Sequence, residues 1–160
     1  WWRLSNREFG ACSGRDKRAA LHDLVRRGHE PGMLADRAGE PVGWVAVAHR
    51  AEFTRLNRST KLFPVDDTSV WSVPCFYVHR SHRRRGVTEA LLDAAIAHAT
   101  ARHAELLEGY PIDTGDRRRS GGELYTGSLT IFERAGFTEV ARRGGRPIVR
   151  KRLASPPPMR

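Results

Sequence analysis

The sequence predicts a single α/β domain in which helices cover a mixed β-sheet. The chain has 160 residues, which is enough for one hydrophobic core and too few for two comfortable ones. Hydrophobic residues make up 39% of it, as in ordinary globular proteins. Strand patterns occur before, between and after helix patterns, an order that favours a layered sheet with helices on its faces. We expect the domain over residues 1–153 and a flexible proline-rich tail over 154–160.

The N-terminal half predicts one helix, a pair of strands and a long loop. Ser13 and Asp16 have the spacing of a helix start, and Gly28 is typical of a helix end. Residues 32–49 contain two strand-like runs around a turn, and the second run is apolar almost throughout, as in a central strand. Residues 49–68 are mostly polar, and we expect them to form a substrate loop.

The middle of the chain predicts a strand, a basic loop and a helix in direct succession. β-Branched and aromatic residues indicate a strand over 70–78, where Pro74 predicts an edge position, a bulge or a break in pairing. Apolar residues at helical spacing from Val87 predict a helix that ends near His103. The loop between these two elements contains the densest basic cluster of the sequence.

The C-terminal part predicts a further strand, a helix and a final hairpin. Residues 104–111 have a strand pattern, and an amphipathic helix is expected from about Thr126 to Ala135. Gly136 followed by a phenylalanine is typical of a helix stop. Residues 137–153 read as two strands joined by a glycine turn.

Charge and composition narrow the classes of partner. Lys and Arg number 28 against 18 Asp and Glu, a net charge of +10 that favours nucleic acid, an acidic surface or a phosphorylated small molecule. The two cysteines, Cys12 and Cys75, are too few for a disulfide framework, and a reducing cytoplasm fits them best. No apolar run has the length of a membrane span, so we expect no membrane association. Trp1 in place of Met is compatible with an N-terminal truncation.

Residues 79–88, "HRSHRRRGVT", have the layout of an anion site. They join a strand to a helix start, where free backbone N–H groups and the helix dipole attract negative charge. Gly86 allows a positive φ or a close backbone approach. Arginine side chains of the loop can hold phosphate oxygens. The alternative interpretation is a solvated basic turn.

The segment "VHRSHRRRGVTEALLDAA" resembles the coenzyme-A-binding segment of the GNAT superfamily of N-acetyltransferases. The matching positions are Val78, Arg83, Gly86 and the "ALL" run at 90–92, whereas Thr88 departs from the small residue usual there. The resemblance implies a mixed, mostly antiparallel sheet with a splayed strand pair at the acetyl-CoA site. It also implies that loop amides bind the pyrophosphate and that the strand backbone pairs with the pantetheine arm. The implied cofactor-binding residues are Phe76, Tyr77, Val78, Arg83, Arg84, Arg85, Gly86, Val87 and Thr88.

The catalytic groups of the family pattern are altered in this sequence. The position at which the family often has a general-acid tyrosine is Phe132, and an accompanying asparagine corresponds to Tyr125. Tyr125 and Ser128 are therefore candidate donors, Ser128 with the alternative of a helix cap. We expect Glu108 as the base, with Tyr110 on the same strand face. Glu108 paired with an arginine as a structural carboxylate, and catalysis through water, are the alternatives.

The resemblance implies an N-acetyltransferase that transfers an acetyl group from acetyl-CoA to a primary amine by direct transfer in a ternary complex. The acceptor is a small-molecule or protein amine, selected by residues 49–68 and 111–122, and a homodimer is compatible with this function. His79 and His82 have a metal-like interval but no accompanying ligands, so we predict no metal. Two alternatives stay open: an acyl-CoA-binding regulator without catalysis, and a basic nucleic-acid-binding domain.

Overall fold

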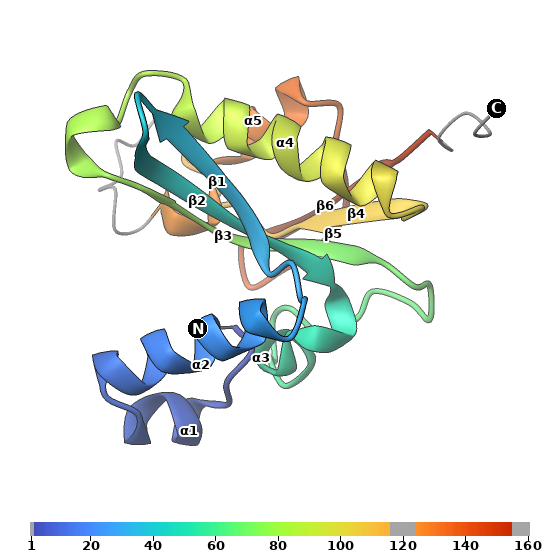
Figure 1. The fold of residues 1–160 in the computed structure, drawn as a ribbon. Coiled ribbons are helices and arrows are strands. Elements are labelled where there is room, and N and C mark those ends of the chain that lie inside the picture. Colours follow the sequence, from blue (N-terminus) through green and yellow to red (C-terminus); the bar gives the residue numbers. More distant parts are fainter. Residues whose placement is uncertain (1, 116–123, 155–160) are drawn as a thin grey trace, which may run out of the picture.

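The computed structural model describes residues 2–115 and 124–154. They form the predicted α/β domain, with one six-stranded sheet in the order β1-β2-β3-β4-β6-β5 and helices on both of its faces (Figure 1). The predicted tail lies almost wholly outside the described residues. The strands are β1 (Gly32–Arg37), β2 (Glu40–His49), β3 (Trp71–Val78), β4 (Leu106–Gly109), β5 (Thr138–Arg143) and β6 (Arg146–Arg152). The α-helices are α1 (Asn6–Ala11), α2 (Gly14–Arg26), α3 (Thr54–Asn57), α4 (Val87–Ala101) and α5 (Leu129–Arg134), and the 3₁₀ turns are η1 (Arg50–Glu52), η2 (Arg80–His82) and η3 (Leu124–Thr126).

The sheet is antiparallel except between β3 and β4, which are parallel neighbours. In this pair, only Trp71–Val73 of β3 are bonded to β4, and their partners are Leu107–Gly109. Pro74 follows directly, and it has no N–H to donate to a neighbouring strand. The β2–β3 register also shifts between Ala46 and Ala48, beside the same point. The predicted break at Pro74 is therefore present, although β3 is a central strand and not an edge strand, and the predicted splayed pair is β3 and β4.

Each face of the sheet carries its own hydrophobic cluster. On one face α4 and α5 cover a cluster that includes Val45, Leu92 and Phe132. On the other face Trp2 and Phe53 belong to a second cluster, on the side where α1, α2 and α3 lie (Figure 1). The splayed ends of β3 and β4 lie between these two layers.

The N-terminal region differs in part from the expectation. The predicted helix is α2, where Ser13 and Asp16 form a reciprocal capping box. A second capping box, between Ser5 and Glu8, starts the short helix α1, which the sequence analysis did not predict. The expected loop at 49–68 is partly helical, because it contains η1 and α3.

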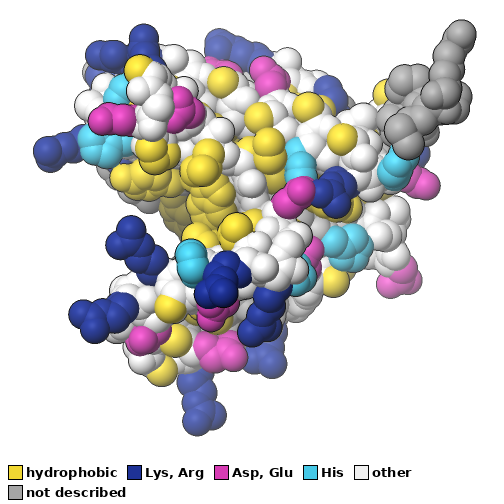
Figure 2. All heavy atoms as spheres, in the orientation of Figure 1, with side chains coloured by type: hydrophobic (Ala, Val, Ile, Leu, Met, Phe, Trp, Pro, Cys, Tyr) yellow, Lys and Arg dark blue, Asp and Glu magenta, His cyan; other side chains and the backbone are white. Residues whose placement is uncertain are grey.

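An apolar hollow separates α2 from the outer part of the sheet (Figure 2). Its volume is about 480 Å³, and its wall includes Val25 of α2, Leu34 of β1 and Trp44 of β2.

Among the described residues, no helix combines the length and the apolar character that a membrane span needs.

Candidate active site

The loop between β3 and α4 has a backbone shape suited to an anion. Gly86 has a φ of 74°, in the left-handed region that glycine adopts without strain, and it immediately precedes the first residue of α4. Arg84 is also left-handed, with a φ of 60°. No side chain of the described residues caps the start of α4. The first N–H groups of α4 therefore lack the side-chain acceptor that many helix starts have, and they are available to a bound anion.

A pocket of about 540 Å³ lies where the splayed end of β3, the loop and the start of α4 meet. Leu124 of η3 and Ile131 of α5 are also part of its wall. The structure brings together here all the predicted cofactor-binding residues except Arg85. These lining residues are Phe76, Tyr77, Val78, Arg83, Arg84, Gly86, Val87 and Thr88.

The three consecutive arginines of this loop carry exposed positive charge. Arg83, Arg84 and Arg85 are all exposed to solvent. Arg83 donates from Nε to the carbonyl oxygen of Val78 at 3.2 Å, which ties the loop to the end of β3. In the described part of the chain no carboxylate forms an ion pair with any of the three. The positive potential at the start of α4 is therefore not neutralised by these residues.

Phe132 fills the space between the diverging strands. It is fully buried, and its ring contacts Phe76 of β3 and Phe137 edge to face, with centroids 6.1 Å and 5.0 Å apart. A Cβ atom at Gly109 of β4 would lie 2.2 Å from this ring, so the fit requires glycine there. Phe132 thus acts as packing at a position where the family pattern often places a hydroxyl.

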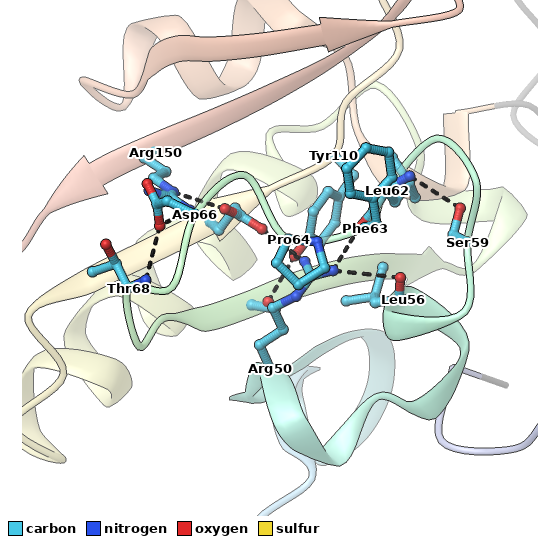
Figure 3. A network of polar contacts seen from close by, with 12 residues as sticks. Arg50, Leu56, Ser59, Leu62, Phe63, Pro64, Asp66, Thr68, Tyr110 and Arg150 are labelled. Carbon is cyan, nitrogen blue, oxygen red and sulfur yellow. Dashed lines mark hydrogen bonds and ion pairs between the residues drawn. The ribbon is translucent and has the colours of Figure 1, made fainter.

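Glu108 and Tyr110 belong to a buried polar network on the face of the sheet that carries the second hydrophobic cluster. Figure 3 shows Arg50, Tyr110 and Arg150 of this network. Glu108 Oε1 accepts from Arg50 Nη1 at 2.8 Å and from the Tyr110 hydroxyl at 2.6 Å. Its Oε2 accepts from Arg150 Nε at 2.7 Å. Ser72 also hydrogen bonds to the Tyr110 hydroxyl, at 2.8 Å. Both carboxylate oxygens of Glu108, which is only 1% exposed, are therefore occupied.

The same network fixes the segment before β3. Arg150 forms a second ion pair with Asp66 at 2.7 Å, and Arg50 donates to the carbonyl oxygen of Leu62 at 2.5 Å. The bond from Arg150 is the largest cause that holds the pKa of Asp66 well below its usual range. The two arginines thus clasp the strap formed by residues 59–68 onto the sheet.

The surroundings of Tyr110 decide its protonation. Burial is the largest cause that raises the pKa of Tyr110 well above its usual value, and the adjacent Glu108 carboxylate adds to this effect. Tyr110 is therefore a neutral hydroxyl that donates to Glu108. These contacts favour the structural interpretation of Glu108 that the sequence also left open, and a base role for Glu108 stays a prediction.

Tyr125 lies apart from this network. It belongs to η3, is 38% exposed, and stacks on Trp2 with ring centroids 6.5 Å apart. Its neighbour Leu124 lines the pocket at the start of α4. Ser128 occupies the residue before α5, but its side chain makes no capping hydrogen bond. Tyr125 thus directly follows a residue that lines the pocket, and its catalytic role stays a prediction.

Two other groups of interest were singled out from the sequence. Burial raises the pKa of the Cys75 thiol to about 11, which keeps this cysteine protonated at neutral pH. The His79 and His82 rings lie 6.2 Å apart, and His79 Nδ1 hydrogen bonds to Ser81. Within residues 2–115 and 124–154 no cluster of three or more metal-ligating side chains occurs.

Arg146 lines a second pocket, and nothing in the sequence distinguishes it as a candidate. It begins β6, is half-buried, and donates from Nη2 to Thr126 Oγ1 of η3 at 3.0 Å. One arginine among 28 basic residues has no distinguishing signal in the sequence, because its burial depends on contacts between distant segments.

Comparisons with known proteins identify the family and the fold. Residues 1–112 match the family model described as the acetyltransferase (GNAT) family. Among curated proteins, none matches the chain significantly.

Solved structures share the fold at low sequence identity. The yncA protein of Salmonella typhimurium, solved with its cofactor acetyl-CoA, is 16% identical with a TM-score of 0.58, and the match covers 92% of this chain and 80% of that one. An N-acetyltransferase from Staphylococcus aureus is 17% identical with a TM-score of 0.57, over 89% and 79%. The ribosomal-protein-alanine N-acetyltransferase of Brucella melitensis is 19% identical with a TM-score of 0.55, over 89% and 80%. The family model covers most of the chain, so the protein belongs to the GNAT family of acetyltransferases, as the loop at the start of α4 predicted, and it is an acyltransferase.

Proposed function

We propose that the pocket at the start of α4 binds acetyl-CoA and that the protein transfers its acetyl group to a primary amine in a ternary complex. The observation that carries this proposal is one pocket that combines a left-handed Gly86, a helix start without a side-chain cap and arginines without a carboxylate partner, all judged among the described residues. The amides of residues 84–88 would hold the pyrophosphate, and Arg83 and Arg84 would add charge-assisted bonds.

The strand geometry supports a place for the pantetheine arm. The pairing of β3 with β4 ends at Val73, so Cys75–Val78 have no β4 partner on that side. Backbone groups there are available to the amides of the arm, in the manner of an added strand. The thioester would then lie in the gap between β3 and β4, close to Phe132.

Acetyl transfer forms a C–N bond to the amine and breaks the C–S bond of the thioester. The leaving thiolate takes up a proton, and the amine loses one. Phe132 has no proton to donate, and Glu108 has no unoccupied oxygen in this structure. We therefore propose Tyr125 as the hydroxyl donor, with water accepting the proton of the amine. Since α4 covers one face of the splayed strands, we propose that the amine approaches from the opposite face.

The two alternatives differ in their support. A regulator that binds acyl-CoA without catalysis is favoured by one observation, the phenylalanine at position 132. A nucleic-acid-binding domain is not favoured, because several of the arginines that raise the net charge form ion pairs within the protein and do not offer free charge to a nucleic acid. Arg50, Arg142 and Arg150 all pair with carboxylates.

Thiol release from acetyl-CoA over a panel of primary amines tests the proposal. Gly86→Trp should reduce turnover at least 100-fold, because the indole would fill the pocket. A Cβ atom at Gly86 meets no atom within 4 Å, so the domain should stay folded, although the left-handed backbone costs about 1–2 kcal/mol. Gly39→Trp is the matched control, since Gly39 is also left-handed with open space around it.

The outcomes separate the alternatives. Undiminished thiol release in Gly86→Trp would contradict the proposed pocket. Acetyl-CoA binding by the wild-type protein without thiol release for any amine would favour the regulator.

A further inference from the structure

A second pocket opens on the face of the sheet away from α4. Its volume is about 330 Å³, and its wall includes Lys61 of the strap, Ile112, Asp113 and Arg146 of β6. Side chains alternate along β6, so that Ile148 and Arg150 belong to the clusters on the face away from α4. By the same alternation Arg146 belongs to that face. Val149 of β6 pairs with Gly109, the last residue of β4. Arg146 lies before Val149, in the part of β6 that extends past the end of β4.

Arg146 is a half-buried cation, and no carboxylate of the described residues offsets its loss of water. Its one hydrogen bond among the described residues goes to Thr126, and its Nε atom is buried without a partner. Burial is the main cause that lowers the pKa of Arg146 below its usual value. The nearby Arg142 differs, because Asp113 and Glu139 both pair with it.

The charges around this second pocket are predominantly positive. Lys61 lies against the Gly144 turn and has no ion pair in the part of the chain that the structure describes. The Asp113 carboxylate accepts from Arg142 at 2.7 Å, so its charge is compensated. Among the described residues, the pocket therefore offers Arg146 and Lys61 as cations without a carboxylate partner. Because Arg146 is half-buried, an anionic group beside it would offset its loss of water.

The second pocket is separate from the cofactor pocket but adjoins it. The two share no lining residue, so the phosphates of acetyl-CoA, which belong at the start of α4, are not the expected anion. The hydrogen bond from Arg146 to Thr126 joins the second pocket to η3. Leu124, two residues before Thr126, lines the cofactor pocket.

We propose that Arg146 binds a carboxylate of the acceptor, and that the acceptor is a small amine that carries this carboxylate, such as an amino acid. The planar guanidinium matches a carboxylate with two parallel hydrogen bonds. A volume near 330 Å³ lies at the small end of ligand pockets. The inference rests on the proposed acetyl transfer and names its substrate class.

The test measures thiol release with amino acids and with their carboxamides, which keep the amine and lack the carboxylate. Wild-type protein should prefer the acids. Arg146→Gln should raise KM for the acids about 10-fold to 100-fold, the range expected for loss of one charge-assisted pair, while changing values for the amides less than twofold. Arg146→Lys should recover part of the preference. Arg152→Gln, on an exposed arginine of the same strand, is the control and should change neither value.

A second measurement does not depend on turnover. Millimolar glutarate should raise the melting temperature of the wild-type protein, and should raise that of Arg146→Gln much less. Equal stabilisation, or an acid-to-amide preference that survives in Arg146→Gln, would overturn the inference. If the protein acetylated only peptides that contain an acidic residue, the proposal of a small amine as the acceptor would also be overturned. Failure of the proposed function is distinguishable, because the protein would then release no thiol with any amine, whereas stabilisation by glutarate is measured without turnover.

Discussion

The protein uses arginine in two contrasting ways on opposite sides of its splayed strands. Arg50 and Arg150 are buried and pair with Glu108, and Arg150 also pairs with Asp66. The arginines of the loop before α4 are exposed and, among the described residues, have no carboxylate partner. The first group holds the strap at 59–68 on the sheet, and the second surrounds an uncapped helix start.

The comparison shows why net charge alone does not assign a function. A buried arginine with carboxylate partners contributes to the fold, and removing one partner leaves an uncompensated charge. An exposed arginine contributes little to stability, but beside free helix N–H groups it adds to an anion site. The two groups should therefore respond to substitution in opposite ways, in stability for one and in ligand affinity for the other.

The largest expected effect is the loss of the shared carboxylate in the buried network. Glu108→Ala should lower the free energy of unfolding by about 3–5 kcal/mol, because Arg50 and Arg150 would lose their common partner. Denaturant unfolding measures this loss. Glu105→Ala, at an exposed position just before β4, is the control and should change little.

A second substitution at Glu108 distinguishes its structural role from a role as the catalytic base. If Glu108 is structural, Glu108→Gln should be destabilised, and its remaining activity should keep the wild-type pH profile. A stable Glu108→Gln variant with a changed pH–rate profile would restore Glu108 as the base.

A smaller effect concerns alkaline pH. The pKa of Tyr110 is raised in the folded state, so above its ordinary value, near 10, the unfolded chain releases a proton that the folded chain retains. Stability is therefore lost as pH rises above about 10, by up to about 1.4 kcal/mol for each pH unit. Tyr110→Phe should remove this contribution. The difference between the two unfolding curves from pH 9 to 11 measures it, and parallel curves would contradict the burial argument.

The smallest expected change in stability belongs to the loop before α4. Arg84→Gln should change the free energy of unfolding by less than about 0.5 kcal/mol, because its charge is exposed and has no ion-pair partner among the described residues. A large loss in the same denaturant assay would mean that the loop arginines are structural, and the contrast between the two groups would fail.

The cofactor pocket could be predicted from the sequence because its residues are close together in the chain. Phe76 to Thr88 form one strand, one loop and one helix start, and the structure brings all of the residues that the family resemblance implied, except Arg85, into one pocket. Their binding of acetyl-CoA stays a prediction. Pro74 likewise predicted the local break where β3 leaves β4.

The buried network could not be predicted in this way. Its ion pairs join residues 58 positions apart, for Arg50 and Glu108, and 84 apart, for Asp66 and Arg150. Glu108 has two arginine partners only because β4 and β6 pair and η1 lies beside them. No local pattern contains that information. Helix α1 is different, because the Ser5–Glu8 spacing that forms its capping box is a local pattern of the sequence.

The most direct test of the central claim is a calorimetric titration of the wild-type protein and Arg84→Gln with acetyl-CoA at two salt concentrations. The account predicts one site with micromolar or tighter affinity, about 8 kcal/mol or more, for the wild-type protein. It predicts binding about 10-fold weaker for Arg84→Gln, with a smaller salt dependence, since one charge-assisted contact is lost. Absence of binding, or equal affinity and salt dependence for both proteins, would contradict the assignment of the unpaired arginines to the cofactor.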